Sequence, residues 1–232
     1  MSIHAGHRQR FRERFQKEGL DSFNDHEVLE FLLHHCIPRQ DTNELGHILI
    51  NHFGSFAKVL EATAGELTDV PGVGEGTAAY LNLLMETIRR YHICKDTQTP
   101  KILKSTHACG NELSKYFVGQ RVEMVYMLCL DAKCKLLACK KLGEGSINSA
   151  AIPTRKVVET AMNLNATTVI IAHNHPSGLA IPSGEDVNTT KRLAVALEAV
   201  DIILADHLIF ADGDYVSLRV SELYNPKECI VI

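Results

Sequence analysis

Apolar residues recur at steps of three and four over most of the first ninety positions, which is the period of an amphipathic helix. The segments with this spacing are 26–37, 42–53, 55–64 and 76–91. Asp25, Thr42 and Ser55 stand at or next to the start of three of them, where N-cap residues are expected. The pattern therefore predicts a small all-α unit.

The period changes after a polar stretch at 94–99 that Pro100 closes, since a proline disfavours helix in the residue before it. We place the boundary there, with a first unit at 1–95 and a second at 101–232. The second unit alternates expected helices at 106–118, 154–165 and 184–199 with expected strands at 123–131, 135–143, 168–173, 202–204, 207–210 and 215–218. A turn at Asp131–Cys134 allows the first two strands to pair. This alternation predicts a mixed α/β layered fold.

The composition of the 232 residues, 45% apolar and 22% charged, is ordinary for a soluble protein. No apolar run approaches the roughly 20 residues that cross a bilayer, and the basic start has no apolar stretch behind it to form a signal peptide. We therefore expect a cytoplasmic protein with no membrane partner.

The chain holds seven cysteines, an odd number, and they form no CxxC pairs. They stand at positions 36, 94, 109, 129, 134, 139 and 229. Most lie in apolar or strand-like stretches, so we expect reduced thiols in the core. The steps of five between Cys129, Cys134 and Cys139 do not match the short ligand spacings of structural zinc sites.

The stretch 168–186 holds the clearest candidate chemistry. A buried-looking strand ends at His173, and His175 follows two residues later, so both imidazoles point the same way. Asp186, in the first turn of the next expected helix, can fold back to supply an oxygen. Three nitrogen and oxygen ligands with one open position describe a catalytic zinc site rather than a closed structural one. The plain alternative is that the histidines only hydrogen-bond to a turn.

The spacing H-x-H, seven residues, Ser, two residues, Asp is matched by His173, His175, Ser183 and Asp186, and it resembles the JAMM/MPN+ metalloprotease signature. The wider run HNHPSGLAIPSGEDVNTTKRL is similar to the RadC family. GHRQRFRERF at 6–15, VPGVG at 70–74, DHLIF at 206–210 and YVSL at 215–218 extend the likeness. The resemblance implies an all-α helix-hairpin-helix domain followed by a JAMM/MPN-like, cytidine-deaminase-like domain of three α/β/α layers.

The resemblance also implies roles for single residues around one zinc ion per chain. A carboxylate must take and return a proton, and Glu123 is the best match, with Glu144 and Glu159 as rivals. The alternative for Glu123 is a solvated residue at the start of an edge strand. Ser183 is expected to stabilise an oxyanion, or else to cap the helix that follows it.

Asp206 and His207 lie together in a strand-like segment downstream of the motif. The carboxylate of Asp206 could orient a zinc-bound histidine from behind. The plainer expectation is that both are polar residues at a strand start.

The segment 67–81 has the form of a helix-hairpin-helix, in which Gly72 and Gly74 bring backbone N–H groups towards a phosphate. Such hairpins bind DNA without reading its sequence. Against this, residues 1–92 hold nine Lys and Arg and thirteen Asp and Glu, and the hairpin itself has no cation. Arg8, Arg10, Arg12 and Arg14 alternate, which spreads them around a helix. The hairpin serves either DNA binding or helix packing.

The leading functional prediction is a zinc-dependent hydrolase of JAMM type, whose relatives cleave peptide or isopeptide bonds in protein substrates. A metal-dependent DNA hydrolase, linked to DNA repair or recombination, is one alternative. The other is a non-catalytic module with a structural zinc that binds DNA or a replication partner. The sequence leaves the substrate and the oligomeric state open.

Overall fold

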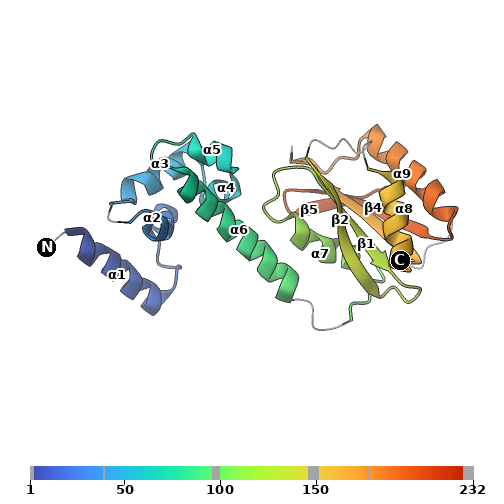
Figure 1. The fold of residues 1–232 in the computed structure, drawn as a ribbon, viewed down its shortest axis with the longest axis horizontal. Coiled ribbons are helices and arrows are strands. Elements are labelled where there is room, and N and C mark those ends of the chain that lie inside the picture. Colours follow the sequence, from blue (N-terminus) through green and yellow to red (C-terminus); the bar gives the residue numbers. More distant parts are fainter. Residues whose placement is uncertain (1–2, 39, 96–99, 146–151, 177, 227–232) are drawn as a thin grey trace. The chain divides into compact units, whose positions relative to one another are not determined.

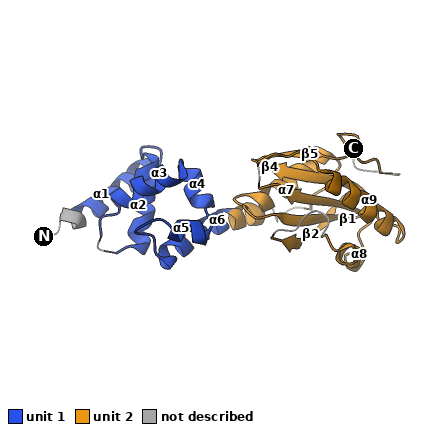
Figure 2. Cartoon of the chain, turned by 90° about the horizontal axis from the view of Figure 1, so that it is seen from above, with its two compact units in different colours: residues 1–88 blue, residues 89–232 orange. Residues whose placement is uncertain are grey.

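The computed structural model describes residues 3–38, 40–95, 100–145, 152–176 and 178–226. The chain forms two compact units, residues 1–88 and residues 89–232 (Figure 2). The dividing point lies inside a long helix, α6 (Glu75–Lys95), rather than in the polar stretch where we expected it. Residues 96–99 of that stretch and Cys229 lie outside the described residues.

Six helices make up the described part of the first unit. They are α1 (Ile3–Glu18), α2 (Asp25–Cys36), α3 (Asn43–Phe53), α4 (Phe56–Glu61), α5 (Ala64–Thr68) and α6. The apolar faces of α2 to α6 meet in one core that includes the fully buried Leu29, Leu33 and Leu49. Asn24, not Asp25, is the N-cap of α2, while Thr42 and Ser55 take the cap positions of α3 and α4.

The turn between α5 and α6 has the residues that such a tight connection requires. Gly72 adopts a φ of +94°, which favours glycine, and the side chains of Val70 and Val73 are buried on either side of it. The turn is thereby packed into the helical core. The helices flanking it are unequal, since α5 has only five residues.

A five-stranded mixed sheet forms the centre of the second unit, in the order β2-β1-β3-β4-β5 (Figure 1). The strands are β1 (Met124–Leu130), β2 (Leu136–Glu144), β3 (Thr168–Asn174), β4 (Ile203–Ala211) and β5 (Asp214–Ser217). β1 and β2 pair antiparallel across the predicted turn, and β3 pairs antiparallel with β1 and parallel with β4. The mixed α/β architecture expected from the sequence is confirmed.

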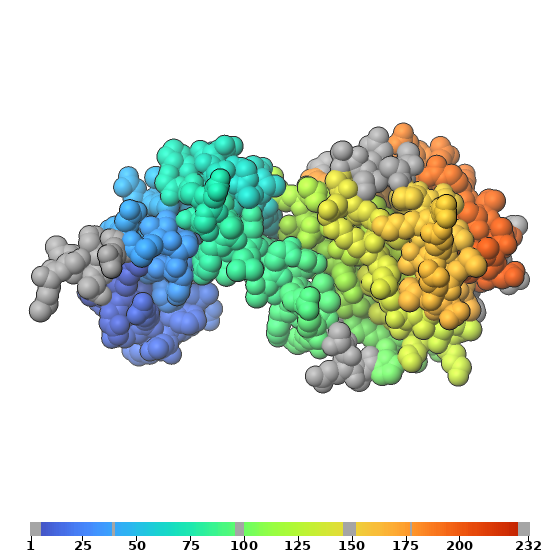
Figure 3. Space-filling view, in the orientation of Figure 1, coloured from blue at the N-terminus to red at the C-terminus, as the bar shows by residue number. Residues whose placement is uncertain are grey.

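Helices cover both faces of this sheet (Figure 1). On one face, α7 (Thr106–Phe117) contributes to an apolar cluster with Tyr126, Leu128 and Leu208. On the other, α8 (Thr154–Asn163) and α9 (Gly184–Glu198) enclose a second cluster with Val169 and Ile171. Their outer sides lie at the surface of the unit (Figure 3). Because both faces are covered, every residue of β3 is buried, as is typical of a central strand.

The prediction of two strands at 202–204 and 207–210 is wrong, because β4 is one strand. The pairing with β3 passes from Leu204 directly to Asp206, so Ala205 is the extra residue of a β-bulge. The bulge reverses which residues face each helix layer. As a result His207, like Ile209, faces the layer of α8 and α9, while Asp206 faces the layer of α7.

The described cysteines are thiols rather than disulfides, as expected. Cys109, Cys129 and Cys134 are buried, Cys36 and Cys139 are half-buried, and Cys94 is exposed, so the expectation of a core position is wrong for Cys94. Over the described ranges, no helix is both long enough and apolar enough to cross a bilayer.

Candidate metal centre

His173 is held at the centre of the sheet, at the carboxyl end of β3. It pairs with Val125 of β1 on one side and with Ile209 of β4 on the other. Its side chain has no exposed surface and points to the same face as Val169 and Ile171, towards α9. Sheets of α/β proteins commonly bind ligands at the carboxyl ends of strands that are followed by crossover helices.

His175 follows the end of β3 and is half-buried. Its backbone N–H donates to the carbonyl of Phe210 at 2.8 Å, which extends the sheet pairing by one residue. Its Nδ1 lies 3.1 Å from the carbonyl oxygen of Leu179. A carbonyl only accepts hydrogen bonds, so Nδ1 bears the proton and Nε2 presents a lone pair. That Nε2 lies 3.0 Å from Nε2 of His173.

Asp186 enters the same space from the first turn of α9, and its side chain is buried. Oδ1 lies 3.2 Å from Nε2 of His173, and Oδ2 lies 3.7 Å from Nε2 of His175. Burial by itself raises the pKa of the Asp186 carboxyl. Its contacts with His173 and its hydrogen bonds from Ser183 outweigh burial, so the pKa lies below its ordinary value and the group is a carboxylate.

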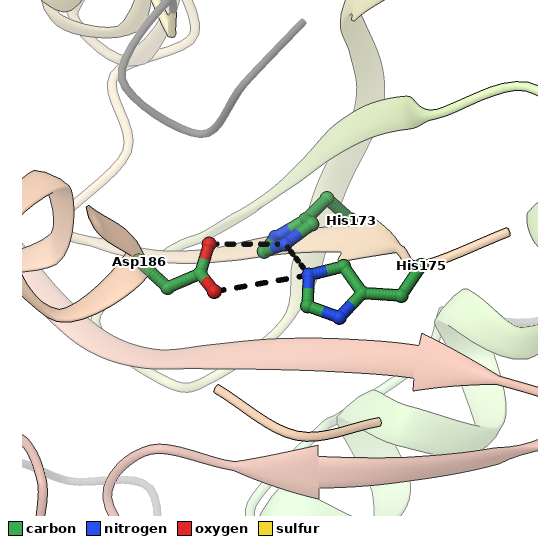
Figure 4. A group of neighbouring side chains, drawn as sticks. All are labelled: His173, His175 and Asp186. Carbon is green, nitrogen blue, oxygen red and sulfur yellow. Dashed lines mark hydrogen bonds and ion pairs between the residues drawn. The ribbon is translucent and has the colours of Figure 1, made fainter. Parts of the chain in front are cut away.

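These three side chains fit a small divalent cation. A tetrahedral zinc ion with ligand distances of about 2.0–2.1 Å keeps its ligand atoms about 3.3 Å apart. The two Nε2 atoms lie 3.0 Å apart, and each is close to a different oxygen of Asp186, Oδ1 at 3.2 Å for His173 and Oδ2 at 3.7 Å for His175 (Figure 4). Two imidazole nitrogens and a carboxylate converge from β3, the loop after it and α9. The residues brought together are the three that the sequence spacing singled out.

A metal site needs three or more His, Cys, Asp or Glu side chains that lie close together. Among the described residues, His173, His175 and Asp186 form such a group. Cys129, Cys134 and Cys139 do not form a second one.

Glu123 directly precedes β1 and is half-buried. Because Val125 pairs with His173, a residue two positions earlier in the strand direction projects to the same face as His173. Burial raises the pKa of the Glu123 carboxyl; the field of His173 lowers it and that of Asp186 raises it further, with a net increase. The charges of two of the candidate ligands therefore act on the pKa of this carboxyl group.

The two rival glutamates are engaged elsewhere. Glu144 is exposed at the end of β2 and forms an ion pair with Lys141. Glu159 is exposed on α8 and forms an ion pair with Arg155 at 2.7 Å. Of the three carboxylates considered from the sequence, the structure brings only Glu123 towards the candidate ligands.

Ser183 is the N-cap of α9 and forms a capping box with Asp186. Its Oγ accepts from the backbone N–H of Asp186 at 3.1 Å and donates to Oδ2 of Asp186 at 2.7 Å. The backbone N–H of Ser183 donates to the same oxygen at 2.7 Å. The serine thus fixes the position of a candidate metal ligand in this structure. The role of oxyanion donor stays a prediction.

Comparison with known proteins places these features in a family. Residues 103–223 match the model of a RadC-like JAB domain, and residues 4–79 match the model of a UPF0758 N-terminal region. A UPF0758 protein of Ruegeria pomeroyi is 34% identical over 92% of this chain and 95% of its own length. A UPF0758 protein of Rhodobacter capsulatus is also 34% identical, over 91% of this chain and 99% of its own. The chain belongs to the RadC family.

A third relative has the same extent. A UPF0758 protein of Fusobacterium nucleatum is 33% identical over 91% of this chain and 94% of its own length. The resemblance to RadC inferred from the motif is confirmed. The matched JAB region contains all three candidate ligands together with Glu123 and Ser183.

In this RadC chain, Asp206 and His207 point to opposite sides of the sheet. Asp206 accepts hydrogen bonds from Ser217 at 2.6 Å and Thr106 at 3.2 Å, and burial raises its pKa. It therefore joins β4 to β5 and α7. His207 is the residue behind the candidate ligands, with its Nε2 2.9 Å from Nδ1 of His173. The sequence suggested that Asp206 orients a ligand from behind, but the residue in that position is His207.

Asn174 lies between the two histidines and faces away from them. Its side chain accepts from the backbone N–H of Met124 at 2.7 Å and donates to the carbonyls of Val122 at 3.0 Å and Gln120 at 3.3 Å. It therefore fixes the segment that contains Glu123 against β3. Sequence analysis assigned no chemistry to Asn174. The available signal for a structural role at the site was its position in the sequence between two candidate ligands.

Proposed function

We propose that this RadC chain is a zinc-dependent hydrolase of the JAMM/MPN+ type that cleaves peptide or isopeptide bonds in a protein substrate. The observation that supports this most is the convergence of His173, His175 and Asp186 beside a half-buried glutamate. Three ligands leave one position of a tetrahedral zinc open, which is the arrangement of catalytic sites. When bound, zinc supplies Lewis-acid polarisation of a carbonyl and makes water more acidic.

The protein's own groups divide the remaining work. Glu123 takes a proton from the attacking water and returns it to the leaving amine, and burial, which raises the pKa of its carboxyl, makes it a better base than an exposed glutamate. Asn174 holds the backbone on either side of Glu123 in place. Ser183 orients Asp186 and is our candidate donor to a developing oxyanion.

The first unit offers weaker support for DNA as a partner. Arg8, one of the cations expected to reach phosphates, donates to the carbonyls of His34, Ile37 and Gln40 and so closes the end of α2. Arg14 forms an ion pair with Glu27 and packs over the ring of Phe23. Both side chains serve the helical core. We therefore favour a protein substrate over DNA hydrolysis and over a non-catalytic DNA-binding module.

The test compares the wild type with Glu123→Gln, which keeps the shape of the side chain but cannot take a proton. The substrates are fluorogenic peptides, isopeptide-linked conjugates, and branched and single-stranded DNA. We expect the wild type to cleave an amide substrate, and Glu123→Gln to retain zinc but lose about 100-fold or more of the rate. Glu144→Gln, at an exposed rival carboxylate, is the matched control and should keep full activity.

Other outcomes would overturn the proposal in distinct ways. Cleavage of DNA alone would point to the DNA hydrolase. DNA binding without cleavage of any substrate, unchanged by Glu123→Gln, would favour the binding module. An equal loss of rate in Glu144→Gln would show that the proton transfer is not specific to Glu123.

A further inference from the structure

Three buried polar side chains form a continuous row behind the candidate metal ligands. Thr190 of α9, His207 of β4 and His173 of β3 each have no exposed surface. Oγ1 of Thr190 lies 2.6 Å from the backbone carbonyl oxygen of Asp186 and 2.6 Å from Nδ1 of His207. Nε2 of His207 lies 2.9 Å from Nδ1 of His173. The row therefore begins at the backbone of one candidate ligand and ends on the ring of another.

The direction of the first two hydrogen bonds follows from the number of protons available. A hydroxyl has one proton, and a backbone carbonyl can only accept. Thr190 must therefore donate to the carbonyl of Asp186, because two acceptor oxygens at 2.6 Å would otherwise repel each other. Its oxygen is left to accept from His207, so Nδ1 of His207 bears a proton.

The contact between the two histidines then has one arrangement that leaves both rings neutral. With its Nδ1 protonated, a neutral His207 presents a lone pair at Nε2, and His173 donates to it from Nδ1. The reverse arrangement would place a positive charge on His207, a ring with no exposed surface, where desolvation penalises charge. In this arrangement Nε2 is the atom of His173 that faces His175 and Asp186, and it is the atom left to bind a cation.

We propose that Thr190 and His207 are positioning residues that fix His173 in its Nδ1-protonated tautomer and so direct its Nε2 towards the metal. This inference rests on the proposed metal site but not on the substrate that is hydrolysed. It gives the β-bulge at Ala205 a function, since the bulge turns His207 towards α9. It also couples two ligands, because Thr190 binds the backbone of Asp186 while its partner holds His173.

The test measures zinc affinity by competition with a chelating dye in Thr190→Val, which keeps the shape of the side chain but removes the hydroxyl. Loss of an outer hydrogen-bond partner of a ligand typically weakens metal binding by about 10- to 100-fold, and we expect a loss in that range. Thr190→Ser retains the hydroxyl and should bind zinc within about threefold of the wild type. Thr168→Val, which alters a buried threonine at the opposite end of β3, is the matched control and should not change the affinity.

A second measurement reads the tautomer directly in the metal-free wild type, so the proposal does not depend on how well a variant folds. Long-range ¹H–¹⁵N correlation spectra of the histidine rings should show a proton on Nδ1 of His173 and a proton on Nδ1 of His207. In Thr190→Val, both tautomers should be populated.

The inference is wrong if Nδ1 of His173 carries no proton in the wild type, or if Thr190→Val binds zinc as tightly as the wild type. Replacement of both His173 and His175 by alanine separates failure of the metal site from failure of the positioning role. If that change abolishes zinc binding while Thr190→Val has no effect, the metal site stands and the positioning role fails. If the double change leaves zinc binding intact, the metal site itself fails.

Discussion

At the scale of single residues, the surroundings of Glu123 have a consequence for stability that is independent of any substrate. Burial, together with the carboxylate of Asp186, raises its pKa despite the opposing field of His173. The folded protein therefore holds this proton more tightly than the unfolded chain does. Stability falls as pH rises from the ordinary carboxyl pKa through the raised one, because ionised Glu123 is less favourable in the fold than in water.

Glu123→Gln removes this titration from metal-free protein. We expect the variant to be more stable than the wild type at pH 7, and the difference to shrink as the pH is lowered towards about 4.5, the ordinary pKa of a glutamate. Urea unfolding of both proteins with a chelator present, at several pH values, measures this difference in the free energy of unfolding. A difference that stays constant with pH, or grows towards acid, would show that the Glu123 carboxyl has no raised pKa.

Some residues of the candidate site could be predicted from the sequence, and others could not. His173, His175 and Asp186 could be selected because an i, i+2 pair on a strand and a carboxylate in the next helix turn depend only on local geometry. Thr190 and His207 could not be placed in the same way, since their contact depends on the position of a bulge in β4. The signal for Thr190 was its spacing of four from Asp186, which puts both on one face of a helix.

At the scale of elements, the capping box at the start of α9 links helix stability to the candidate metal site. Ser183 both caps the helix and holds Oδ2 of Asp186. Replacement of an N-cap serine by alanine costs about 1 kcal/mol, which lowers the melting temperature of a chain of this size by about 2–4 °C. Because the same change also frees the Asp186 carboxylate, we expect Ser183→Ala to weaken zinc binding as well.

Thr63 provides the control for this prediction. It forms the same kind of capping box with Glu66 at the start of α5, in the other unit. Thr63→Ala should reduce stability to a similar degree and leave zinc affinity unchanged. Thermal melts and chelator competition on both variants measure the two effects, and equal zinc affinities would show that Ser183 does not position its ligand.

Elements were predicted best where a strong period or a clear turn defined them. The pairing of β1 with β2 and the position of α9 followed from the sequence. The helices α1 and α5 did not, because α1 has few apolar residues and five residues are too few for α5 to show a helical period. The single strand β4 was expected as two because the polar pair at Asp206 and His207 interrupts an apolar run.

At the scale of the whole molecule, the change of period after the first ninety residues predicted two kinds of structure in one chain. The chain forms two compact units, and the point where they divide lies inside α6. The acidic balance of the first unit and the internal use of Arg8 and Arg14 both argue against a surface for phosphates. We therefore place the candidate chemistry in the second unit.

The most direct test of the central claim is the zinc content of the purified protein after equilibration with zinc and removal of the excess, measured by mass spectrometry. The wild type should contain close to one zinc per chain. The variant in which alanine replaces both His173 and His175 should contain essentially none while keeping its helical content by circular dichroism. Equal zinc content in the two proteins, or none in the wild type, would contradict the assignment.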